Sequence, residues 1–442
     1  MAGIVKTTPL SQYRLTRRRF GISAAGAVAG AMAVPLLGRP SQAFAGRLQD
    51  SSLSGKVTQW CYPLAAGGDQ AANENMWKEL ASGFNAQYPD VEVSVDVLPW
   101  ANRNEKLTTA LAAGAGPDVA YLNADLVPQH AKDGNLEPVD DVIADDAGDF
   151  AENSKTNLTY DGALCAVPIL GSVTTLIYNT KLFDQLGLTD YPTTWDELLA
   201  IGPAFKDAGL YLTSYAGALE QTLNLTYFPL LWQAGGEVVS EDGTKAAFNS
   251  PEGLEALNFV VKLFDDGFTN RDEAVTAPPP DAGVALEGKV GVLMAGDNAS
   301  AKQFQEKWGA DAVKIGAPLK NKVQTSYGTT AGFGIFKDAK DKDAAKAWVK
   351  YITAPEQMTT IVQSGGYIPP RTSLNGIYKD DPMLSTFQEY APLMHGDVRN
   401  PAARQIISAV APYVQAAFLG KQSAEDALKD AEKDVNRILD RV

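Results

Sequence analysis

The hydrophobic positions between residues 55 and 125 follow two different periods. The segment DVEVSVDVLPW, residues 90–100, places valine at every second position, which predicts a strand with one buried face. The segment before it, NENMWKELASGFNAQYP, spaces its large apolar residues three or four apart, which predicts a helix that ends at Pro89. Three further elements complete this region, namely strand-like runs at 55–64 and 117–125 and a helical run at 104–114. Strands that alternate with helices over short connections predict an α/β fold with a mainly parallel sheet covered on both faces.

The same two periods continue through the rest of the chain. GVLMAG (291–296) and KIGAPL (314–319) are strand-like, and residues 343–366 predict two helices that are separated at Pro355 and end at glycine. The tail predicts an amphipathic helix that begins after Ser423, whose hydroxyl can cap the first turn. We find no internal repeat. A chain of this length exceeds what one hydrophobic core normally organises, so we expect two domains.

The first 45 residues follow a third pattern, in which a basic start precedes a weakly apolar run. Three consecutive arginines (17–19) are followed by the Ala- and Gly-rich run 22–37, and the small-residue sequence Ala-Phe-Ala ends at Ala45. The run is too short and too weakly apolar to span a membrane stably, and its glycines disfavour a buried helix. We therefore predict an export signal over residues 1–45, cleaved after Ala45. The arginine pair before Phe20 indicates the twin-arginine type.

The charge of the remaining chain narrows its partners. Residues 1–45 contain six basic and no acidic residues, so the rest carries 32 basic and 53 acidic residues and a formal charge of −21. This charge disfavours nucleic acids and anionic membrane surfaces as partners, because both attract basic patches. No later run is long and apolar enough to cross a bilayer, and no cysteine stands at the cleavage site for a lipid anchor. We expect a freely diffusing periplasmic protein.

Few residues offer catalytic or metal chemistry. His130 lies in a segment that predicts an exposed helix and His395 lies in a loop rich in Pro and Gly, so both are best interpreted as solvated or structural. Cys61 and Cys165 allow either one disulfide or two buried free thiols. We find no nucleophile elbow, phosphate-binding glycine loop or zinc-binding helix motif, and we expect no cofactor and no metal. A glycosidase that draws two carboxylates from distant strands stays open as an alternative.

Eleven short stretches, in order along the chain, resemble one protein family. Each alone is a weak signal, since TWDEL by itself is only a capped helix, but together they span essentially the whole chain after residue 45. Among them are FNAQYPDVEV, KLTTALAAGAGPDVAYL, YDGALCAVPI, TLIYNTKLFDQLGL, PTTWDELLAIGPAFKDAG, FNSPEGLEALNFVVKLFDDG, LEGKVGVLMAG and GGYIPPR. The chain is thereby similar to the extracellular solute-binding proteins of ABC transporters, in the sugar-binding group that includes maltose-binding protein.

The resemblance implies a two-lobed α/β fold of the type II periplasmic-binding-protein class. Each lobe would be a mainly parallel sheet flanked by helices, and a hinge of several segments would join the lobes. The implied first lobe combines residues 46–170 and 327–376, and the second combines residues 171–326 and 377–442. The chain would cross between the lobes three times, near 167–179, 318–336 and 375–385. Such a hinge lets two lobes close on a ligand.

The resemblance also implies a ligand site where loops of both lobes face the cleft. Open α/β sheets bind ligands at the carboxyl ends of their strands, and sugar hydroxyls suit carboxylates and amides beside aromatic faces. The implied contact positions are Tyr62, Trp100, Asn123, Asp125, Ser172, Asn224, Asp297, Asn298, Thr330, Gly332 and Arg371. For each position an ordinary strand-end or turn residue is the alternative, because Asn and Asp also favour turns for local reasons.

Three of these expectations concern single features. Relatives often carry a tryptophan after the strand that is GVLMAG here, whereas this chain continues with DNAS, which favours a small polyhydroxylated ligand over a long stacked oligosaccharide. An inward-pointing Arg371 would allow an acidic sugar. Asp125 is expected to face water in the empty protein, so that its removal would change the stability of the empty protein little.

The resemblance implies transport and not catalysis. The protein would capture a small sugar or polyol in the periplasm and would deliver it as a monomer to the membrane subunits of an ABC permease by closing its lobes. One alternative is a binding protein for another polar solute, such as an amino acid derivative or a polyamine. The other is a secreted carbohydrate-active enzyme.

Overall fold

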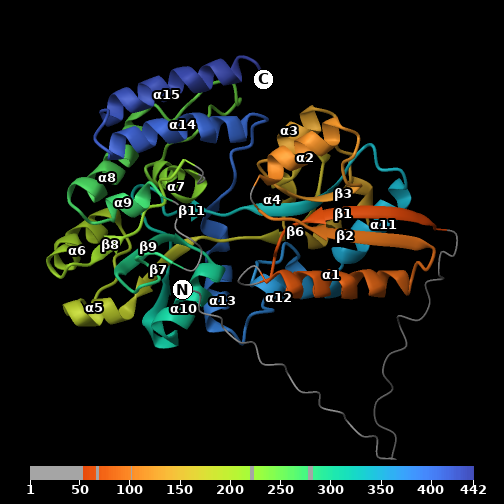
Figure 1. Cartoon of the computed structure of the whole chain (residues 1–442), viewed down its shortest axis with the longest axis horizontal. Helices are drawn as coiled ribbons and strands as arrows, with labels where there is room; N and C mark the ends of the chain where they lie inside the picture. The colour runs from red at the N-terminus through yellow and green to blue at the C-terminus, as the bar shows by residue number, and fades with distance from the viewer. Residues whose placement is uncertain (1–52, 66–68, 101, 220–222, 277–281) are drawn as a thin grey trace, which may run out of the picture. The chain divides into compact units, whose positions relative to one another are not determined.

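The structure is a computed structural model that describes residues 53–65, 69–100, 102–219, 223–276 and 282–442. The predicted export signal lies outside these residues. Within them the chain forms a five-stranded sheet and a four-stranded sheet, each packed against its own set of helices (Figure 1). We call the five-stranded sheet with its helices the first lobe and the four-stranded sheet with its helices the second lobe.

The sheet of the first lobe has the strand order β2-β1-β3-β12-β6. Its strands are β1 (Gly55–Cys61), β2 (Val91–Val97), β3 (Val119–Asn123), β6 (Val167–Gly171) and β12 (Thr330–Ile335). β1 runs parallel to β2 and β3, as the alternating pattern predicts, but β12 runs antiparallel to both β3 and β6. Because β6 is antiparallel to β12, it points the same way as β1, β2 and β3, so the sheet is mainly parallel as expected, and only β12 runs against the other four strands.

The sheet of the second lobe has the order β10-β7-β9-β8. Its strands are β7 (Thr175–Asn179), β8 (Tyr211–Thr213), β9 (Val290–Gly296) and β10 (Val313–Gly316). β7 is antiparallel to both of its neighbours, and only β8 and β9 run parallel. β8, β9 and β10 therefore share one direction, and β7, which follows directly from β6 in the other lobe, is the one strand of this sheet that runs against them.

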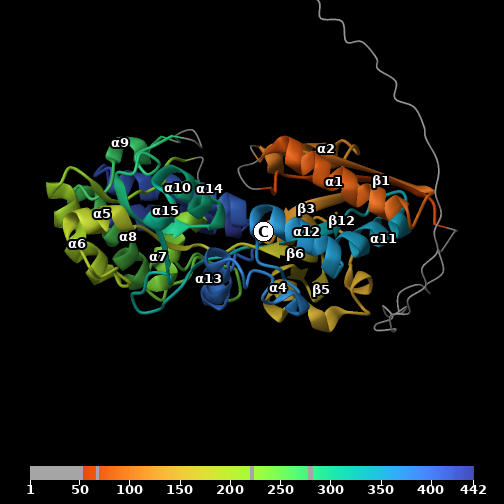
Figure 2. The same cartoon turned by 90° about the horizontal axis from the view of Figure 1, so that it is seen from below.

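Helices cover both sheets (Figures 1 and 2). Those of the first lobe are α1 (Gln70–Asn85), α2 (Arg103–Ala112), α3 (Val127–Lys132), α4 (Glu152–Asn157), α11 (Lys342–Ile352) and α12 (Pro355–Gly365). Those of the second lobe are α5 (Thr180–Leu186), α6 (Trp195–Asp207), α7 (Tyr227–Gln233), α8 (Pro251–Asp265), α9 (Arg271–Ala274), α10 (Asn298–Trp308), α13 (Pro382–Tyr390), α14 (Ala403–Phe418) and α15 (Ala424–Leu439). Short 3-10 turns include η3 (Ala147–Asp149), η4 (Leu223–Leu225) and η6 (Thr372–Leu374).

Apolar periodicity explains how these helices pack. The face of α1 that carries Trp77 and Phe84 is buried, as its spacing predicts, and packs into the core of the first lobe. The helix pair on either side of Pro355 and the C-terminal helix capped by the Ser423 hydroxyl are also confirmed. Each large core surrounds one sheet, so burial of apolar side chains stabilises each lobe about its own sheet.

Three stretches of chain meet where the lobes join. β6 and β7 belong to different sheets and are separated only by residues 172–174. Ser172 N–H donates to the carbonyl of Thr329 at 2.9 Å, and Gly171 N–H donates to the carbonyl of Ile368 at 2.7 Å. The short strands β11 (Ser326–Tyr327) and β13 (Met394–His395) pair in parallel beside them. The lobe boundaries proposed from the sequence stay a prediction.

The positions of the two histidines and the two cysteines can be compared with the expectations from the sequence. His130 is only 3% exposed on α3, so the expected exposed position is wrong; its ring packs edge-on against Phe336. His395 stacks on Trp232 with the ring centroids 4.0 Å apart, which is a structural role. Cys61 and Cys165 are both buried and unbridged, so of the two alternatives the structure has free thiols. No helix in the described part of the chain is long and apolar enough to cross a bilayer.

Candidate functional site

The strand ends of the first lobe bring four predicted contact positions to one edge of the sheet. Tyr62 follows β1 directly, and Asn123 and Asp125 lie at the end of β3. β12 begins at the same edge, because Ala331 is paired with Asn123 and the carbonyl of Thr330 accepts a hydrogen bond from Ala124 N–H. Carboxyl ends of parallel strands are the usual ligand-binding edge of α/β sheets, so this edge is the natural place for a site.

Three aromatic rings form one wall of this edge. Tyr62 stacks on Trp100 with centroids 4.8 Å apart, and Tyr121 meets both rings edge-on at 5.9 and 5.8 Å. The Arg103 guanidinium lies 4.8 Å from the centre of the Trp100 ring. Tyr62 and Tyr121 are buried, whereas Trp100, whose ring Tyr62 and Arg103 both contact, is 37% exposed. The exposed part of this ring can contact the apolar side of a sugar ring.

A carboxylate from the first lobe meets a guanidinium from the second lobe beside these rings. Asp125 is 2% exposed, and its Oδ2 lies 2.5 Å from Nε of Arg404 on α14. The contact is an ion pair without regular hydrogen-bond geometry, and neither oxygen of Asp125 accepts a hydrogen bond among the described residues. The expectation that Asp125 faces water in the empty protein is therefore wrong. Because Oδ2 is paired with Arg404, Oδ1 is the oxygen of Asp125 that has no partner and could accept a hydrogen bond from a ligand.

A second buried carboxylate lies close by. Asp397, 5% exposed, accepts hydrogen bonds from Tyr327 Oη at 2.7 Å, from Asn224 Nδ2 at 3.3 Å and from the hydroxyl of Thr329. Burial and then the charge of Asp125 raise the pKa of Asp397 to about 7, although its hydrogen bonds and Arg404 oppose this shift. Asn224 is thus connected to Asp125 through Asp397, a carboxylate that was not predicted from the sequence.

The pKa of one tyrosine shows that the aromatic wall and the carboxylates are neighbours. Burial raises the pKa of Tyr121 well above its usual value, and the charges of Tyr367, Asp397 and Tyr62 raise it further, whereas Arg103 lowers it. Tyr121 therefore lies near Asp397 as well as against the rings of Tyr62 and Trp100. We call this group, Tyr62, Trp100, Arg103, Asn123, Asp125, Asn224, Asp397 and Arg404, the polar–aromatic cluster.

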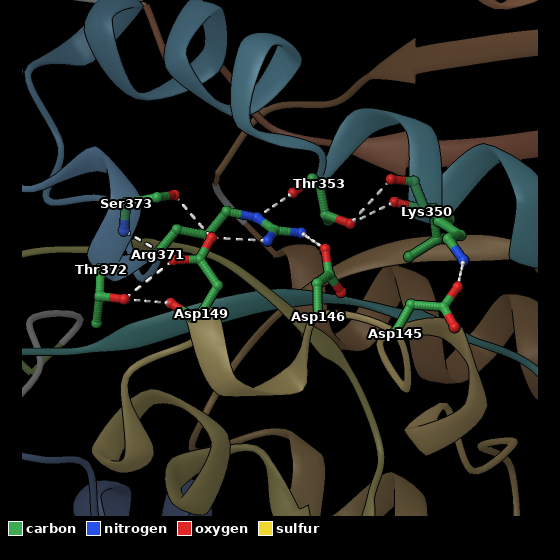
Figure 3. Close-up of polar contacts among 9 residues, drawn as sticks. Asp145, Asp146, Asp149, Lys350, Thr353, Arg371, Thr372 and Ser373 are labelled. Atoms are coloured by element: carbon green, nitrogen blue, oxygen red, sulfur yellow. Dashed lines mark hydrogen bonds and ion pairs between the residues drawn. The ribbon is translucent and has the colours of Figure 1, made fainter. Parts of the chain in front are cut away.

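The structure removes Arg371 from the predicted ligand contacts. Arg371 is 3% exposed, and its guanidinium donates to the Thr353 carbonyl at 2.7 Å, to Asp149 at 3.0 Å and to Asp146 at 2.8 Å (Figure 3). It also lies 4.0 Å above the ring of Phe150. The side chain joins the end of α11 to the turn η3 within one lobe, so the expectation that it enters a cleft is wrong, and the acidic-sugar hypothesis loses its basis.

Three other predicted positions have structural roles. Asp297 caps α10, accepting from Ser300 N–H at 2.8 Å and from the Ser300 hydroxyl at 2.6 Å. The side-chain amide of Asn298 donates to the Gly365 carbonyl across the lobes. Gly332 is packed inside the sheet, where an added Cβ would lie 2.6 Å from the Val167 carbonyl oxygen, so its place in the contact set is wrong.

Ser172 and Thr330 lie at the junction of the lobes. Both line a small cavity of about 80 Å³ formed by the crossing segments. The Thr330 hydroxyl accepts a hydrogen bond from Asn157 Nδ2 at 3.1 Å. Their part in ligand binding stays a prediction, and their observed contacts belong to the hinge.

A larger hollow of about 180 Å³ lies in the second lobe, at the carboxyl ends of β8 and β9. Helices α7 and α10 complete its walls. In the described residues no group of three or more His, Cys, Asp or Glu side chains is placed to hold a metal ion. The site is therefore described by hydrogen-bonding groups and apolar faces.

Five residues of this region were not singled out from the sequence: Arg103, Tyr121, Tyr327, Asp397 and Arg404. Tyr121 lies in an apolar strand and resembles any core residue, and Asp397 lies in a loop without a periodic signal. Arg404 did carry a signal, because a cation in the first turn of a helix opposes the helix dipole. That unfavourable position is offset by the carboxylate of Asp125.

A two-lobed α/β fold with a polar and aromatic cluster at its strand ends defines a solute-binding protein of the periplasmic type. The sequence profile of the bacterial extracellular solute-binding protein family matches residues 67–359, and the chain belongs to this family. The resemblance found in the sequence is thereby confirmed.

Individual relatives agree with this assignment. A Brucella abortus (strain 2308) protein that carries only the general name of a binding protein is 26% identical over 372 residues, covering 82% of this chain and 89% of that protein. The diacetylchitobiose binding protein of Streptomyces coelicolor is 24% identical over 387 residues, covering 84% of this chain and 88% of that protein. A solved structure of an ABC transporter solute-binding protein from Thermotoga lettingae, bound with α-D-tagatose, has a TM-score of 0.75 and 25% identity and covers 87% of this chain and 100% of that chain.

Proposed function

We propose that this protein captures a small carbohydrate or polyol and delivers it to the membrane subunits of an ABC transporter. The observation that carries the proposal is the polar–aromatic cluster, in which the stacked rings of Tyr62 and Trp100 and the buried carboxylate of Asp125 all follow strand ends of the first-lobe sheet. A sugar presents hydroxyl donors around apolar ring faces, and this cluster offers an acceptor and an aromatic face for both. The sugars named for the Streptomyces and Thermotoga relatives support the proposal.

The delivery step rests on family membership and on the hinge. Members of this family are extracellular solute-binding proteins, which implies export and a permease partner. We further propose that export uses a twin-arginine signal cleaved after Ala45, that the protein acts as a monomer in the periplasm, and that the lobes close over the ligand. Closure would supply the form that the transporter recognises.

Two alternatives can be separated from this proposal by one experiment. Buried carboxylates such as Asp125 would also suit a polyamine, and a carbohydrate-active enzyme would use a similar groove. A thermal-shift screen of the protein after removal of residues 1–45 should compare sugars, polyols, amino acids and polyamines. A ligand at one hundred times its Kd should stabilise the protein by about 2.7 kcal/mol.

The outcome assigns the function. Stabilisation by sugars or polyols, with the mass of the ligand unchanged after prolonged incubation, supports capture for transport. Stabilisation by polyamines or amino acids alone would replace the sugar proposal with another solute. Conversion of a bound sugar to a product of different mass would contradict the transport function.

A further inference from the structure

Two buried carboxylates lie close together where the lobes meet. Asp125 follows β3 of the first lobe and is 2% exposed, and Asp397 lies between β13 and α14 and is 5% exposed. The Thr330 carbonyl accepts a hydrogen bond from Ala124 N–H at 3.0 Å, and the residue before it, Thr329, donates its hydroxyl to the second carboxylate. Two like charges in a buried position repel each other, so such a pair favours a state in which one carboxyl group holds a proton.

The two carboxylates have different partners. Oδ2 of Asp125 lies 2.5 Å from Nε of Arg404, and this cation stabilises the ionised form of the carboxylate. The side chains that donate hydrogen bonds to Asp397 are all neutral, namely those of Tyr327, Asn224 and Thr329. Asp125 is therefore the member of the pair that stays ionised, and Asp397 is the member that can take up a proton.

The hydrogen bonds of Asp397 leave a place for that proton on Oδ2. Oδ1 accepts from Tyr327 Oη at 2.7 Å and from Asn224 Nδ2 at 3.3 Å. Oδ2 contacts the hydroxyl of Thr329. A hydroxyl accepts hydrogen bonds as well as donating them, so a protonated Oδ2 can donate to Thr329 and keep its partner. Both protonation states of Asp397 thus have hydrogen-bond partners in the same arrangement of side chains.

The charged and titratable groups that face Asp397 come from three elements. They are Asp125 and Tyr121 of β3 and its end, Arg404 of α14 and Tyr327 of β11. The ionisable neighbours of Asp397 in the sequence contact other groups. The ring of His395 stacks on Trp232, and Arg399 donates to the Thr156 carbonyl at 3.4 Å. Of the groups that face Asp397, the one that belongs to the first lobe and carries a negative charge is Asp125.

We infer that closure of the lobes over a ligand is coupled to the uptake of a proton by Asp397, so that the solute is bound more tightly in acidic than in alkaline solution. The inference rests on the proposed function and adds a proton to its binding step. When the lobes separate, β3 carries Asp125 away from α14, whereas Arg404 stays on α14 close to Asp397. Water then reaches Asp397, and the repulsion that favours its protonated form is lost.

The size of the effect follows from the groups around Asp397. With the lobes in contact, burial and then the charge of Asp125 raise the pKa of Asp397 to about 7. In the open form both causes weaken, so the pKa falls towards the usual value near 4. Between these values closure takes up a proton, and affinity falls as the pH rises through 7. We expect an uptake of about half a proton per ligand at pH 7, and an affinity about tenfold lower at pH 8 than at pH 6.

Titration calorimetry measures both quantities. The probes are glucose, tagatose, mannitol and N,N′-diacetylchitobiose, none of which has a group that titrates between pH 6 and pH 8. The Kd of the tightest binder is measured at pH 6, 7 and 8. At pH 7 the titration is repeated in phosphate and in Tris, which differ in their enthalpy of ionisation, so the change in observed enthalpy gives the number of protons taken up.

Two variants identify the group that takes up the proton. The side chain of Asp397→Asn resembles the protonated acid, because one atom accepts and the other donates, so its affinity should change less than about twofold between pH 6 and pH 8 and its proton uptake should be close to zero. The control is His395→Gln, since a histidine can also gain a proton near neutral pH. This variant should keep the tenfold change in affinity and the proton uptake.

Each outcome is decisive. A sugar that binds with equal affinity at pH 6 and pH 8 and without proton uptake overturns the inference and leaves sugar capture intact. So does a pH dependence that survives in Asp397→Asn or is lost in His395→Gln. Failure of every probe to bind, in calorimetry and in the thermal screen, overturns the proposed function and this inference with it.

A second variant decides if Asp397→Asn does not fold, as judged from its melting curve. The hydroxyl of Thr329 lowers the pKa of Asp397, so Thr329→Val should move the fall in affinity to a higher pH than in the wild type. An unchanged pH profile in this variant would contradict the role of Asp397.

Discussion

Replacing Arg371 by methionine should destabilise the first lobe without weakening ligand binding. Methionine keeps much of the apolar volume but removes the guanidinium, which donates to Thr353, Asp146 and Asp149. A hydrogen bond to a charged group contributes about 1.5–3 kcal/mol when it is buried. Asp146 and Asp149 keep 40% and 22% of their side chains exposed, so water screens the pairs and rehydrates the carboxylates in the variant. We therefore expect a net loss of about 3 kcal/mol.

Thermal unfolding measures this loss. For a folding unit of about 150–250 residues, such a change lowers the melting temperature by roughly 6–12 °C. The control is Lys350→Met on the neighbouring helix, which removes an equally basic side chain from an exposed ion pair with Asp145 (Figure 3). Exposed pairs contribute about 0–1 kcal/mol, so the control should shift the melting temperature little.

The effect of Arg371 should also depend on pH. Burial opposes ionisation of Asp149, but hydrogen bonds from Ser373, Arg371 and Thr372 outweigh it and lower the pKa of Asp149 to about 2. A depressed pKa contributes stability above the unfolded value near 4, and this contribution is lost as the pH falls towards 2. The difference between wild type and Arg371→Met should therefore shrink below pH 4. A variant that melts like the wild type but loses tenfold or more in sugar affinity would refute the structural role and return Arg371 to the site.

Four further predictions concern the site and export. Asp125→Ala should weaken sugar binding about ten- to a hundredfold in calorimetry, and should lower the stability of the empty protein by about 1–3 kcal/mol, because Arg404 loses its partner; an unchanged apo melting curve would contradict the ion pair. Burial and the charge of Asp125 raise the pKa of Asp397 to about 7, so the stability that protonated Asp397 contributes is lost as the pH rises from about 4 through 7. Relative to the wild type, the melting temperature of Asp397→Asn should therefore rise between pH 4.5 and pH 8, so that at pH 8 it approaches or exceeds the wild-type value. Saturating sugar should reduce the radius of gyration in small-angle scattering, and an unchanged radius would argue against closure. Lysine at positions 17–19 keeps the charge but not the guanidinium, so full processing at Ala45 in that variant would contradict the twin-arginine signal.

Local periodicity was enough to predict many of the elements. The alternating valines of β2 and the apolar stripe of α1 fix strand and helix because each element must bury one face. The direction of β12 could not be predicted in this way. It pairs with β3 across roughly 200 residues of sequence, and its antiparallel direction follows from how the chain returns through the hinge.

The site was predicted in part for a similar reason. Strand ends are visible in a sequence, so Tyr62, Asn123 and Asp125 could be placed at one edge. Partners that come from the other lobe leave no local pattern, and Asp397 and Arg404 were therefore missed. The same limit explains why Arg371 was wrongly predicted to contact the ligand, since its carboxylate partners Asp146 and Asp149 lie more than 200 residues earlier in the chain.

The distribution of unsatisfied polar atoms connects the stability of this fold with its ligand. Among the described residues, buried side-chain atoms without a hydrogen-bond partner include Oδ1 of Asp125, Oδ1 of Asn123 and Nε of Arg103 at the polar–aromatic cluster. Each such group costs about 1–3 kcal/mol relative to a satisfied one, so a chain under selection for stability alone would replace them. A ligand that supplies the missing donors and acceptors at the polar–aromatic cluster would remove part of that cost. Affinity and thermal stabilisation should therefore be lost together when these atoms are removed, whereas Arg371→Met should lower stability alone.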